Sequence, residues 1–502
     1  MRVVRGIALL VLIGGCASAG APAATPSPGA GPSPRVALRQ FIDSLVDVPD
    51  FRSTHWGMLV VDPGRGETLY ARNADKLFMP ASNMKLLTGA TALAQLGPDY
   101  RWTTSLFARG PVRDGVLAGD LVVRGNGDPS VSAHMQKGDA LAPLRALADS
   151  LRAHGVTRVH GRLVAAPSPF TDAPLGFGWS WDDLDDSYSA GVDALYFNEG
   201  FTEVVVRGGP RAGDSVRATT RPASSFPALI VRARTVAPLA AGANAADSAV
   251  ARAAITVSQD SSRAGVLVAG TIAAGDSAIV EITFRDQPAA YLLALREALA
   301  ARGIDVDDAR TDSTARLDSL VTMRSPALRE VLPFFEKPSQ NQIGELLFKT
   351  LALEKTGVGR ADSAARVVSR QLLAWGAEPD GFTVRDGSGL SRHDYVSPRT
   401  LVTVLDAMRR HPEFRLFYDA LPVAGVDGTI RSRMRGTPAQ GNVHAKTGTL
   451  DKARSLSGYV TTADGRLLLF SALCNNYVVP TRRVDAVTDA LGVRLATMRL
   501  DP

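Results

Sequence analysis

The middle of this chain has a different sequence pattern from its two ends. Between about residues 101 and 320, short runs rich in Val, Thr and Ile alternate with Gly, Asp and Pro, which is typical of antiparallel strands joined by turns. On both sides of this segment, apolar residues recur at helical spacing, as in residues 82–96 and 343–353. The simplest fold is a sheet built from both ends of the chain and covered by helices, with the middle inserted. We therefore predict the α/β (α+β) class, with β-rich inserted subdomains.

The amino terminus reads as an export signal. Two arginines precede an apolar run over residues 7–13, and the signal closes with Ile-Gly-Gly-Cys at Cys16. Because this ending resembles a bacterial lipobox, we predict a signal peptide over residues 1–15, lipidation of Cys16, and a flexible tether over residues 16–35. The alternative is an ordinary signal peptide that is cut near Ala19 and carries Cys16 away. We expect an exported, periplasmic protein that is anchored to a membrane through this lipid.

Charge and hydrophobicity exclude several classes of protein. The 502 residues carry 56 Lys+Arg against 50 Asp+Glu, and the basic residues are scattered, so we expect no nucleic-acid partner. Beyond residue 20 no uncharged apolar run approaches the ~18 residues that a spanning helix needs, which excludes a polytopic membrane protein. Only 8 of the 56 cations are lysines. A lysine in an unusual setting is informative, because a buried lysine can lose its proton near neutral pH and an arginine cannot.

Three short motifs could carry out chemistry, and the first is Ser82-Asn83-Met84-Lys85. It lies at the start of the predicted helix, so Ser82 and Lys85 share one helix face. A neutral lysine can accept the proton of a nucleophilic serine, and a helix amino terminus favours an oxyanion. Alone, a Ser-x-x-Lys pair is common by chance, and Ser82 would more often be a helix cap while Lys85 faces solvent.

The other two motifs lie far downstream. Ser339-Gln340-Asn341 precedes a predicted helix, where a hydroxyl and an amide could relay a proton and hold a peptide carbonyl. Lys446-Thr447-Gly448-Thr449 ends a predicted strand over residues 441–446. Its lysine and hydroxyls would hold a carboxylate, and its glycine would let a substrate backbone approach closely. Taken singly, the former is an ordinary helix cap and the latter an exposed strand edge with a turn.

The three motifs together are much more specific than each one alone. They follow the order used by penicillin-recognising serine enzymes, and three of the eight lysines, Lys85, Lys337 and Lys446, lie in or beside them. The chain resembles the class C low-molecular-mass penicillin-binding proteins, which are serine D-Ala-D-Ala carboxypeptidases and endopeptidases. The resemblance extends over residues 36–498. It includes three longer strings, at residues 125–129, 386–392 and 421–429.

The resemblance implies a transpeptidase/β-lactamase-like domain, with an antiparallel sheet flanked by helices, that is interrupted by two inserted domains. Lys85 and Ser339 are 254 positions apart, as such an insertion requires. One departure is Gly344, where alanine looks more usual, and this should affect helix packing and not chemistry. The implied division gives residues 36–103 and 322–502 to the catalytic domain, residues 104–192 and 285–321 to an inserted domain II, and residues 193–284 to an inserted β-rich domain III.

The resemblance also implies a mechanism. Ser82 would attack the carbonyl between two D-residues of a peptidoglycan stem peptide or cross-link, with Lys85 as general base, and water would release the acyl-enzyme. Ser339 would pass the proton to the leaving amine, and Asn341 would place the substrate amide. Penicillins and other β-lactam antibiotics would acylate the same serine, and no cofactor or metal is implied. The terminal carboxylate would bind to Lys446, Thr447, Gly448 and Thr449.

Two other segments are expected to contact the substrate. Residues 179–186 form the most acidic aromatic cluster of the chain, and Asp183 within it could meet the amine of a stem-peptide side chain such as diaminopimelate. Arg392 could meet the carboxylate of that side chain, and Ser388 is expected to bind substrate as well. The alternative for residues 179–186 is a solvated acidic loop.

Two other functions remain open on the sequence. A β-lactamase or esterase could use the same serine and lysine, although the long insertion and the lack of a Glu-x-x-Leu-Asn string weaken a class A β-lactamase. Slow turnover of a penicilloyl-enzyme would separate a carboxypeptidase from a β-lactamase. A non-catalytic lipoprotein that only binds peptidoglycan would be expected to show a broken motif, and none of the three is broken.

Overall fold

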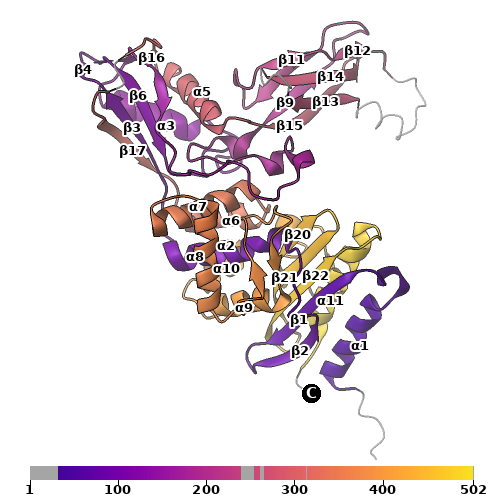
Figure 1. Cartoon of the computed structure of the whole chain (residues 1–502). Coiled ribbons are helices and arrows are strands. Elements are labelled where there is room, and N and C mark those ends of the chain that lie inside the picture. Colours follow the sequence, from indigo (N-terminus) through magenta and orange to yellow (C-terminus); the bar gives the residue numbers. More distant parts are fainter. Residues whose placement is uncertain (1–31, 239–253, 260–264, 312–313, 501–502) are drawn as a thin grey trace, which may run out of the picture.

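The chain folds as a mixed α/β protein, as predicted (Figure 1). The computed structural model describes residues 32–238, 254–259, 265–311 and 314–500. The predicted signal peptide, Cys16 and nearly all of the predicted tether lie outside the described residues. Within the described ranges, no helix is both long enough and apolar enough to cross a membrane.

A five-stranded antiparallel sheet joins the two ends of the chain. Its strand order is β2-β1-β22-β21-β20, so two strands from the amino-terminal part pair with three from the carboxy-terminal part. This is the predicted assembly, and it leaves β20 at one edge of the sheet. The strands are β1 (His55–Asp62), β2 (Glu67–Arg72), β20 (His444–Leu450), β21 (Ala453–Thr461) and β22 (Leu467–Asn475).

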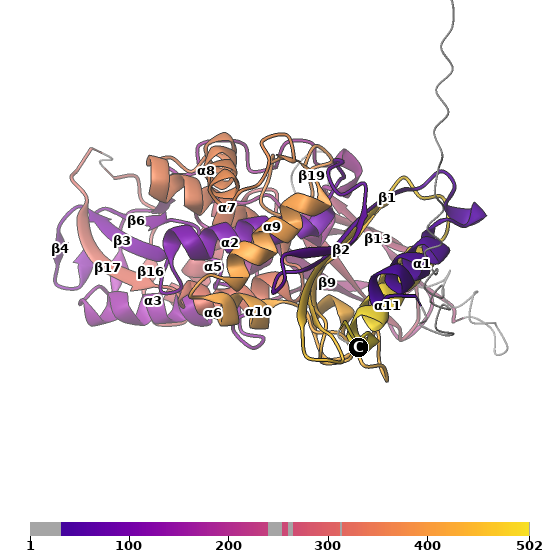
Figure 2. The same ribbon diagram turned by 90° about the horizontal axis from the view of Figure 1, so that it is seen from below.

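Helices cover both faces of this sheet (Figure 2). One face packs against α1 (Pro34–Val46) and α11 (Thr481–Thr497). Along β22 successive side chains point to opposite faces, so Leu468 and Phe470 enter this core while Leu469 and Leu473 enter the other. The second core is formed with α2 (Met84–Leu96), α6 (Leu328–Glu336), α7 (Asn341–Thr356), α8 (Ala361–Ala374), α9 (Pro398–Arg409) and α10 (Phe414–Ala420). A two-stranded sheet of β18 (Phe382–Thr383) and β19 (Tyr395–Val396) lies beside it.

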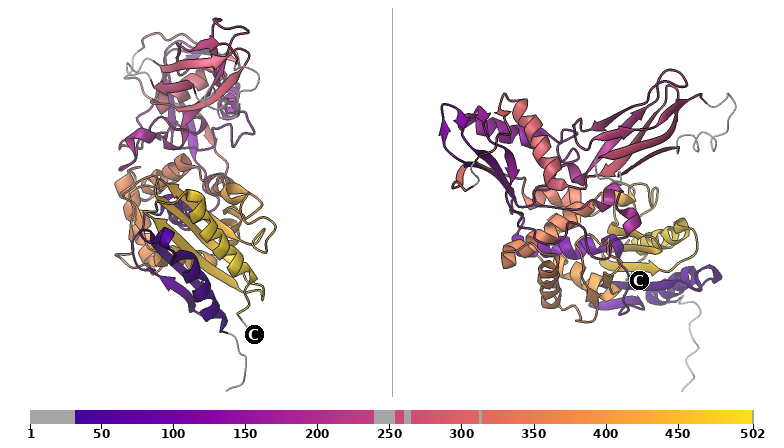
Figure 3. Two further views of the ribbon diagram at one scale, coloured as in Figure 1. Left: turned by 90° about the vertical axis from the view of Figure 1, so that its right-hand side faces the viewer. Right: turned by 45° about the horizontal axis from the view of Figure 1, so that its top comes forward.

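The residues between α2 and α6 form two further units that project from the helical layer around α6 and α7 (Figures 1 and 3). In the first unit, β17 pairs with β3, which brings the start and the end of the insertion together. Two sheets, β17-β3-β6-β8 and β16-β7-β5-β4, enclose a core with two helices. The elements are β3 (Thr103–Arg109), β4 (Val112–Arg113), β5 (Val116–Leu117), β6 (Asp120–Gly125), α3 (Ala142–Ala153), β7 (Arg158–Val159), β8 (Leu163–Ala165), α5 (Gln287–Ala300), β16 (Asp305–Val306) and β17 (Asp318–Arg324).

The second unit consists of strands alone among the residues that the structure describes. One sheet has the order β10-β9-β15. In the other sheet, β11, β12 and β13 each pair with β14. Alternate side chains of both sheets, such as Val204, Val206, Val266 and Val268, fill a small shared core. The strands are β9 (Phe201–Arg207), β10 (Arg217–Arg221), β11 (Leu229–Val231), β12 (Arg234–Val236), β13 (Ile255–Gln259), β14 (Val266–Ala273) and β15 (Ser277–Thr283).

One predicted strand is displaced in the structure. The sequence places a strand over residues 441–446, with the Lys-Thr-Gly-Thr motif at its end, whereas β20 begins at His444 and runs to Leu450. The reason is a turn at residues 439–443, in which Gly441 has a left-handed φ of 70° and Val443 N–H donates to Ala439 O. The motif therefore lies inside an edge strand.

Candidate active site

The first motif has the geometry of a serine and its base. Ser82 lies in the 3-10 turn Ala81–Asn83, and Lys85 lies in the first turn of α2 that follows. The side chains come together because they are three residues apart on continuous helical backbone. Lys85 Nζ lies 2.9 Å from Ser82 Oγ. Ala81, the first residue of this turn, has a left-handed φ of 48°, which bends the chain sharply just before Ser82.

The other neighbours of Lys85 determine how its amine can act. Nζ also donates to Asn341 Oδ1 at 2.6 Å and to the Ser388 carbonyl at 2.7 Å. The amide of Asn341 is held in this orientation because its Nδ2 donates to the Tyr188 carbonyl at 2.8 Å. Both oxygens can only accept hydrogen bonds, so a neutral Lys85 amine donates its two N–H groups to them. Its lone pair is then left for the Ser82 hydroxyl, which is the arrangement that a general base requires.

The surroundings of Lys85 favour the neutral amine. The side chain is completely buried. Burial lowers the pKa of Lys85 well below its usual value, and the positive charge of Lys446 lowers it further, while the carboxyls of Glu336, Asp386 and Glu345 oppose the change. Lys85 can therefore take a proton from Ser82 near neutral pH.

The second and third motifs meet the first in one site. Lys446 is fully buried on β20, and its Nζ donates to Ser339 Oγ at 2.8 Å. Asn83, the neighbour of Ser82, donates from Nδ2 to the Lys446 carbonyl at 2.8 Å. Ser339 itself has a left-handed φ of 66°, at the tight turn between α6 and α7. The structure thus brings together Ser82, Lys85, Ser339, Asn341 and Lys446.

Known proteins resemble this chain in sequence and in fold. The family model described as the D-Ala-D-Ala carboxypeptidase 3 (S13) family matches residues 38–498. The D-alanyl-D-alanine carboxypeptidase of Actinomadura sp. (strain R39) is 34% identical over 478 residues, which are 91% of this chain and 84% of that protein.

The chain belongs to the S13 family. The resemblance seen in the sequence is therefore confirmed, and the protein is a serine peptidase of the D-Ala-D-Ala carboxypeptidase family. D-alanyl-D-alanine carboxypeptidase DacB of Haemophilus influenzae is 26% identical over 429 residues, covering 84% of this chain and 85% of its own. The crystal structure of penicillin binding protein 4 from H. influenzae has the same fold, with a TM-score of 0.74, 23% identity, and coverage of 90% of this chain and 98% of that one.

In this S13 peptidase, the glycine of the third motif is required by the protein itself. A Cβ on Gly448 would overlap Ser455 Oγ on β21 and the Pro80 carbonyl just before the Ser82 turn. Ser455 Oγ donates to that same carbonyl at 2.8 Å, so β20, β21 and the Ser82 turn are packed together at this point. The sequence suggests that the glycine serves close approach of a substrate backbone, whereas the close approach seen here is between two parts of the chain.

Gly448→Ala is expected to destabilise the protein and to impair acylation. The added methyl group must displace either β21 or the Ser82 turn, and overpacking of this kind costs about 1–3 kcal/mol. A shift of the nucleophile by about 1 Å should lower the acylation rate by about 100-fold. Thermal unfolding and the rate of acylation by penicillin measure the two effects. Gly64→Ala is the control, since its Cβ would meet only Asp62 Oδ1, at 3.2 Å; equal behaviour of the two variants would contradict this packing argument.

The two threonines of the third motif have partners within the protein. Thr447 Oγ1 lies 2.7 Å from Thr429 Oγ1, and Thr449 Oγ1 accepts from Arg454. Thr429 belongs to the loop over residues 421–429, which is tied to the second motif by the Lys337–Asp427 ion pair at 2.6 Å. The loop over residues 421–429 therefore supports the strand that carries Lys446.

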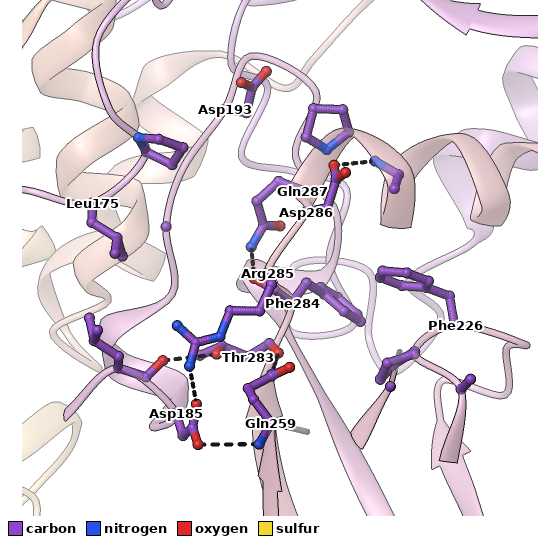
Figure 4. Close-up of a pocket in the computed structure, with 18 of the residues that line it drawn as sticks. Leu175, Asp185, Asp193, Phe226, Gln259, Thr283, Phe284, Arg285, Asp286 and Gln287 are labelled. Atoms are coloured by element: carbon purple, nitrogen blue, oxygen red, sulfur yellow. Dashed lines mark hydrogen bonds and ion pairs between the residues drawn. The ribbon is translucent and has the colours of Figure 1, made fainter. Parts of the chain in front are cut away.

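The insertion contributes directly to the site through residues 180–190. The carbonyls of Tyr188 and Ser187 accept from Asn341 and from Gln342 at the start of α7. On its other side, this segment is tied to the β-rich unit, because the Gln259 N–H of β13 donates to Asp185 Oδ2 and Thr283 Oγ1 of β15 donates to the Leu184 carbonyl. Asp185 also pairs with Arg285, which follows β15. Figure 4 shows this ion pair in the wall of a cavity of about 1090 Å³, which Gln259 and Thr283 also line. The β-rich unit thus braces the segment that orients Asn341.

Three other residues that the sequence suggests for substrate binding, Asp183, Arg392 and Ser388, have partners outside the three motifs or contact the site through the backbone. Asp183 Oδ1 accepts from Tyr188 OH at 2.8 Å, on the same insertion segment. Arg392 Nε donates to Ser180 Oγ at 3.0 Å, and Arg392 Nη1 donates to the carbonyl of Asp451, directly after β20. Ser388 Oγ is fully buried and accepts from the N–H of Leu390, and the backbone carbonyl of Ser388 accepts from Lys85.

Several residues of the site are not apparent from the sequence. Asn83 is an exception, because it lies within the first motif and a polar residue beside the nucleophile is a signal that the sequence does contain. Tyr188 and Ser388 act through backbone carbonyls, which leave no signal in the residue type. At Gly344, which departs from the family pattern, a Cβ would lie 3.0 Å from the Phe335 ring and 3.1 Å from the Gly387 carbonyl. The glycine therefore allows the loop that carries Ser388 to approach α7.

Proposed function

We propose that the protein cleaves D,D-peptide bonds of peptidoglycan stem peptides and cross-links through an acyl-enzyme on Ser82. The observation that carries the proposal is the environment of Lys85, a buried amine with two hydrogen-free acceptors and one hydroxyl as its partners. Lys85 takes the proton of Ser82 as Oγ bonds to the carbonyl carbon between two D-residues. Backbone N–H groups of Ser82 and Thr449 stabilise the oxyanion.

The second half of the reaction releases the two products. Ser339 passes a proton to the leaving amine as the peptide bond breaks, and Lys446 is its neighbour in the site. Water then attacks the ester on Ser82 with Lys85 as base, which frees the shortened peptide. Lys446, Thr447 and Thr449 hold the terminal carboxylate, and Asn341 places the substrate amide. Penicillin follows the same first step, and its acyl-enzyme is hydrolysed slowly.

Mass spectrometry of the penicillin-treated protein tests this proposal. One penicilloyl group is expected per chain, and peptide mapping should place it on Ser82. The untreated protein should release D-alanine from a peptide ending in D-Ala-D-Ala, and it should split a D,D-cross-linked dimer into two monomeric peptides. An adduct on another residue, or a protein that hydrolyses penicillin rapidly and releases no D-alanine, would overturn the assignment.

We also propose that Asp183 and Arg392 form a subsite for a stem-peptide side chain that carries an amine and a carboxylate, such as diaminopimelate. Asp183 is held by Tyr188, whose carbonyl orients Asn341. Arg392 bridges the insertion and the end of β20. The two opposite charges therefore lie on segments that border the catalytic residues.

Asp183→Asn is expected to reduce the preference for peptides with a free side-chain amine. The ratio of kcat/KM for such a peptide to kcat/KM for its amine-acetylated form should fall about fivefold, because the carboxylate is partly exposed to solvent. Asp182→Asn, at the exposed neighbouring position, is the control. An unchanged ratio in Asp183→Asn would remove this residue from the subsite.

The location and domain division remain proposals from the sequence. We propose that the protein is exported to the periplasm and is anchored as a lipoprotein through Cys16, with residues 16–35 as the tether. The division into residues 36–103 with 322–502, residues 104–192 with 285–321, and residues 193–284 is likewise proposed. The pairing of β3 with β17 at the base of the insertion supports it.

A further inference from the structure

A buried carboxyl that the mechanism does not use lies beneath the site. Glu336 is the last residue of α6, and its exposed fraction is 0%. Neither of its carboxyl oxygens accepts a hydrogen bond from any residue that the structure describes. Burial of a carboxyl without partners is unfavourable, so its presence calls for an electrostatic reason.

The surroundings of Glu336 place its carboxyl beside the first motif. A Cβ on Gly89 of α2 would lie 2.7 Å from Glu336 Oε1. Gly89 is one helical turn after Lys85 and lies on the same face of α2. Glycine inside a helix is unfavourable relative to alanine, and here it leaves the space that the carboxyl occupies. The backbone of Glu336 also leads into the second motif, because Ser339 N–H donates to the Glu336 carbonyl at 3.3 Å.

The charged groups around the two lysines are not equivalent. Glu345 accepts from the N–H groups of Gly387 and Ser388. Asp386 accepts from backbone N–H groups of its own loop and from Trp179 Nε1. The charges of Glu345 and Asp386 raise the pKa of Lys85, whereas the charge of Glu336 raises the pKa of both Lys85 and Lys446. Glu336 is therefore the negative group that both lysines share, and it has no competing donor among the described residues.

We propose that Glu336 is a positioning residue that keeps Lys446 positively charged beside a neutral Lys85, so that Lys446 can hold the carboxylate of the substrate. This inference rests on the proposed function, which assigns these roles to the two lysines. It explains how Lys446 can keep a positive charge although it is buried beside Ser339 in the same site as a second amine. It also assigns a reason to the space left by Gly89.

The direction of the expected pH effect follows from the charges. Burial lowers the pKa of Lys446 to about 8, and the carboxylate of Glu336 opposes this change. Burial raises the pKa of Glu336 to about 7, and the charges of Lys446 and Lys85 oppose that change. Between these values the carboxylate and the Lys446 ammonium coexist. Without the carboxylate, Lys446 has a still lower pKa and loses its charge at a lower pH.

Glu336→Gln tests the inference because it removes the charge and keeps the shape. The acylation rate with benzylpenicillin, which carries a carboxylate, is measured from about pH 5 to pH 10. The alkaline limb is expected to move down by about one pH unit, which lowers the rate at about pH 9 roughly tenfold. Acylation by a neutral aryl ester, which has no carboxylate for Lys446 to hold, should not show this shift. Glu336→Asp keeps the charge and should keep the alkaline limb near its original position.

Stability separates this role from a merely structural one. Glu336→Gln should unfold at about the same temperature as the original protein, since the cost of burying the carboxyl is removed while its favourable interaction with the charge of Lys446 is lost. An unchanged alkaline limb in Glu336→Gln would overturn the inference, as would a uniform loss of rate with both probes together with lower stability. The proposed function fails on a different result, namely a penicilloyl group found away from Ser82 in the original protein.

Discussion

Replacing Ser82 by alanine is expected to abolish covalent labelling by penicillin and to lower D-alanine release by at least about 10⁴-fold. The reason is that the acyl-enzyme cannot form without Oγ, while the oxyanion and carboxylate sites stay in place. Among the residues that the structure describes, Lys85 is the hydrogen-bond partner of Ser82 Oγ, so folding should change little. Intact-protein mass spectrometry and a D-alanine assay measure the loss.

Reversible binding provides a second readout for Ser82→Ala. Lys446 and the two threonines remain, so the variant should still bind penicillin without bonding to it, and calorimetry can detect this. Ser150→Ala is a matched control, since Ser150 lies on α3 and its hydroxyl donates to the Ala146 carbonyl of its own helix. Labelling of Ser82→Ala at the original rate would show that another residue is the nucleophile.

Lys85→Arg is expected to lower acylation by about 1,000-fold although a basic residue is retained. An arginine stays protonated in proteins, so it offers no lone pair to the Ser82 hydroxyl. It would also place a permanent cation close to the Lys446 ammonium in a fully buried site, where like charges repel strongly. The measurement is the second-order rate of penicillin acylation across neutral pH.

The control for Lys85→Arg is the same substitution at an exposed lysine. Lys355 lies in the last turn of α7, is exposed, and should tolerate arginine without change in rate. If Lys85→Arg kept a tenth or more of the original rate at neutral pH, Lys85 would not be the base. The inactive variant should remain folded enough to show cooperative thermal unfolding, which distinguishes loss of the base from loss of the fold.

The motifs could be found in the sequence because each combines residue type with local spacing. Ser82 and Lys85 meet through the geometry of one helical turn, which the periodicity of residues 82–96 predicts. The predicted position of β20 is less accurate, because the turn around Gly441 and the strand that follows it have similar residue types. The contact between the Ser388 carbonyl and Lys85 could not be predicted, since it depends on how a loop packs against α7.

The sequence by itself determined the helical and strand patterns, the insertion between the motifs, and the chemical groups that the site contains. Only the tertiary structure decided the charge states of those groups. Lys85 and Lys446 are distant in the chain, and each becomes an unusual amine only when burial removes water and the other charge comes near. The orientation of Asn341, the carbonyl of Ser388 and the unpaired carboxyl of Glu336 depend on the same long-range packing, because local sequence encodes spacing along an element and not the neighbours that burial supplies.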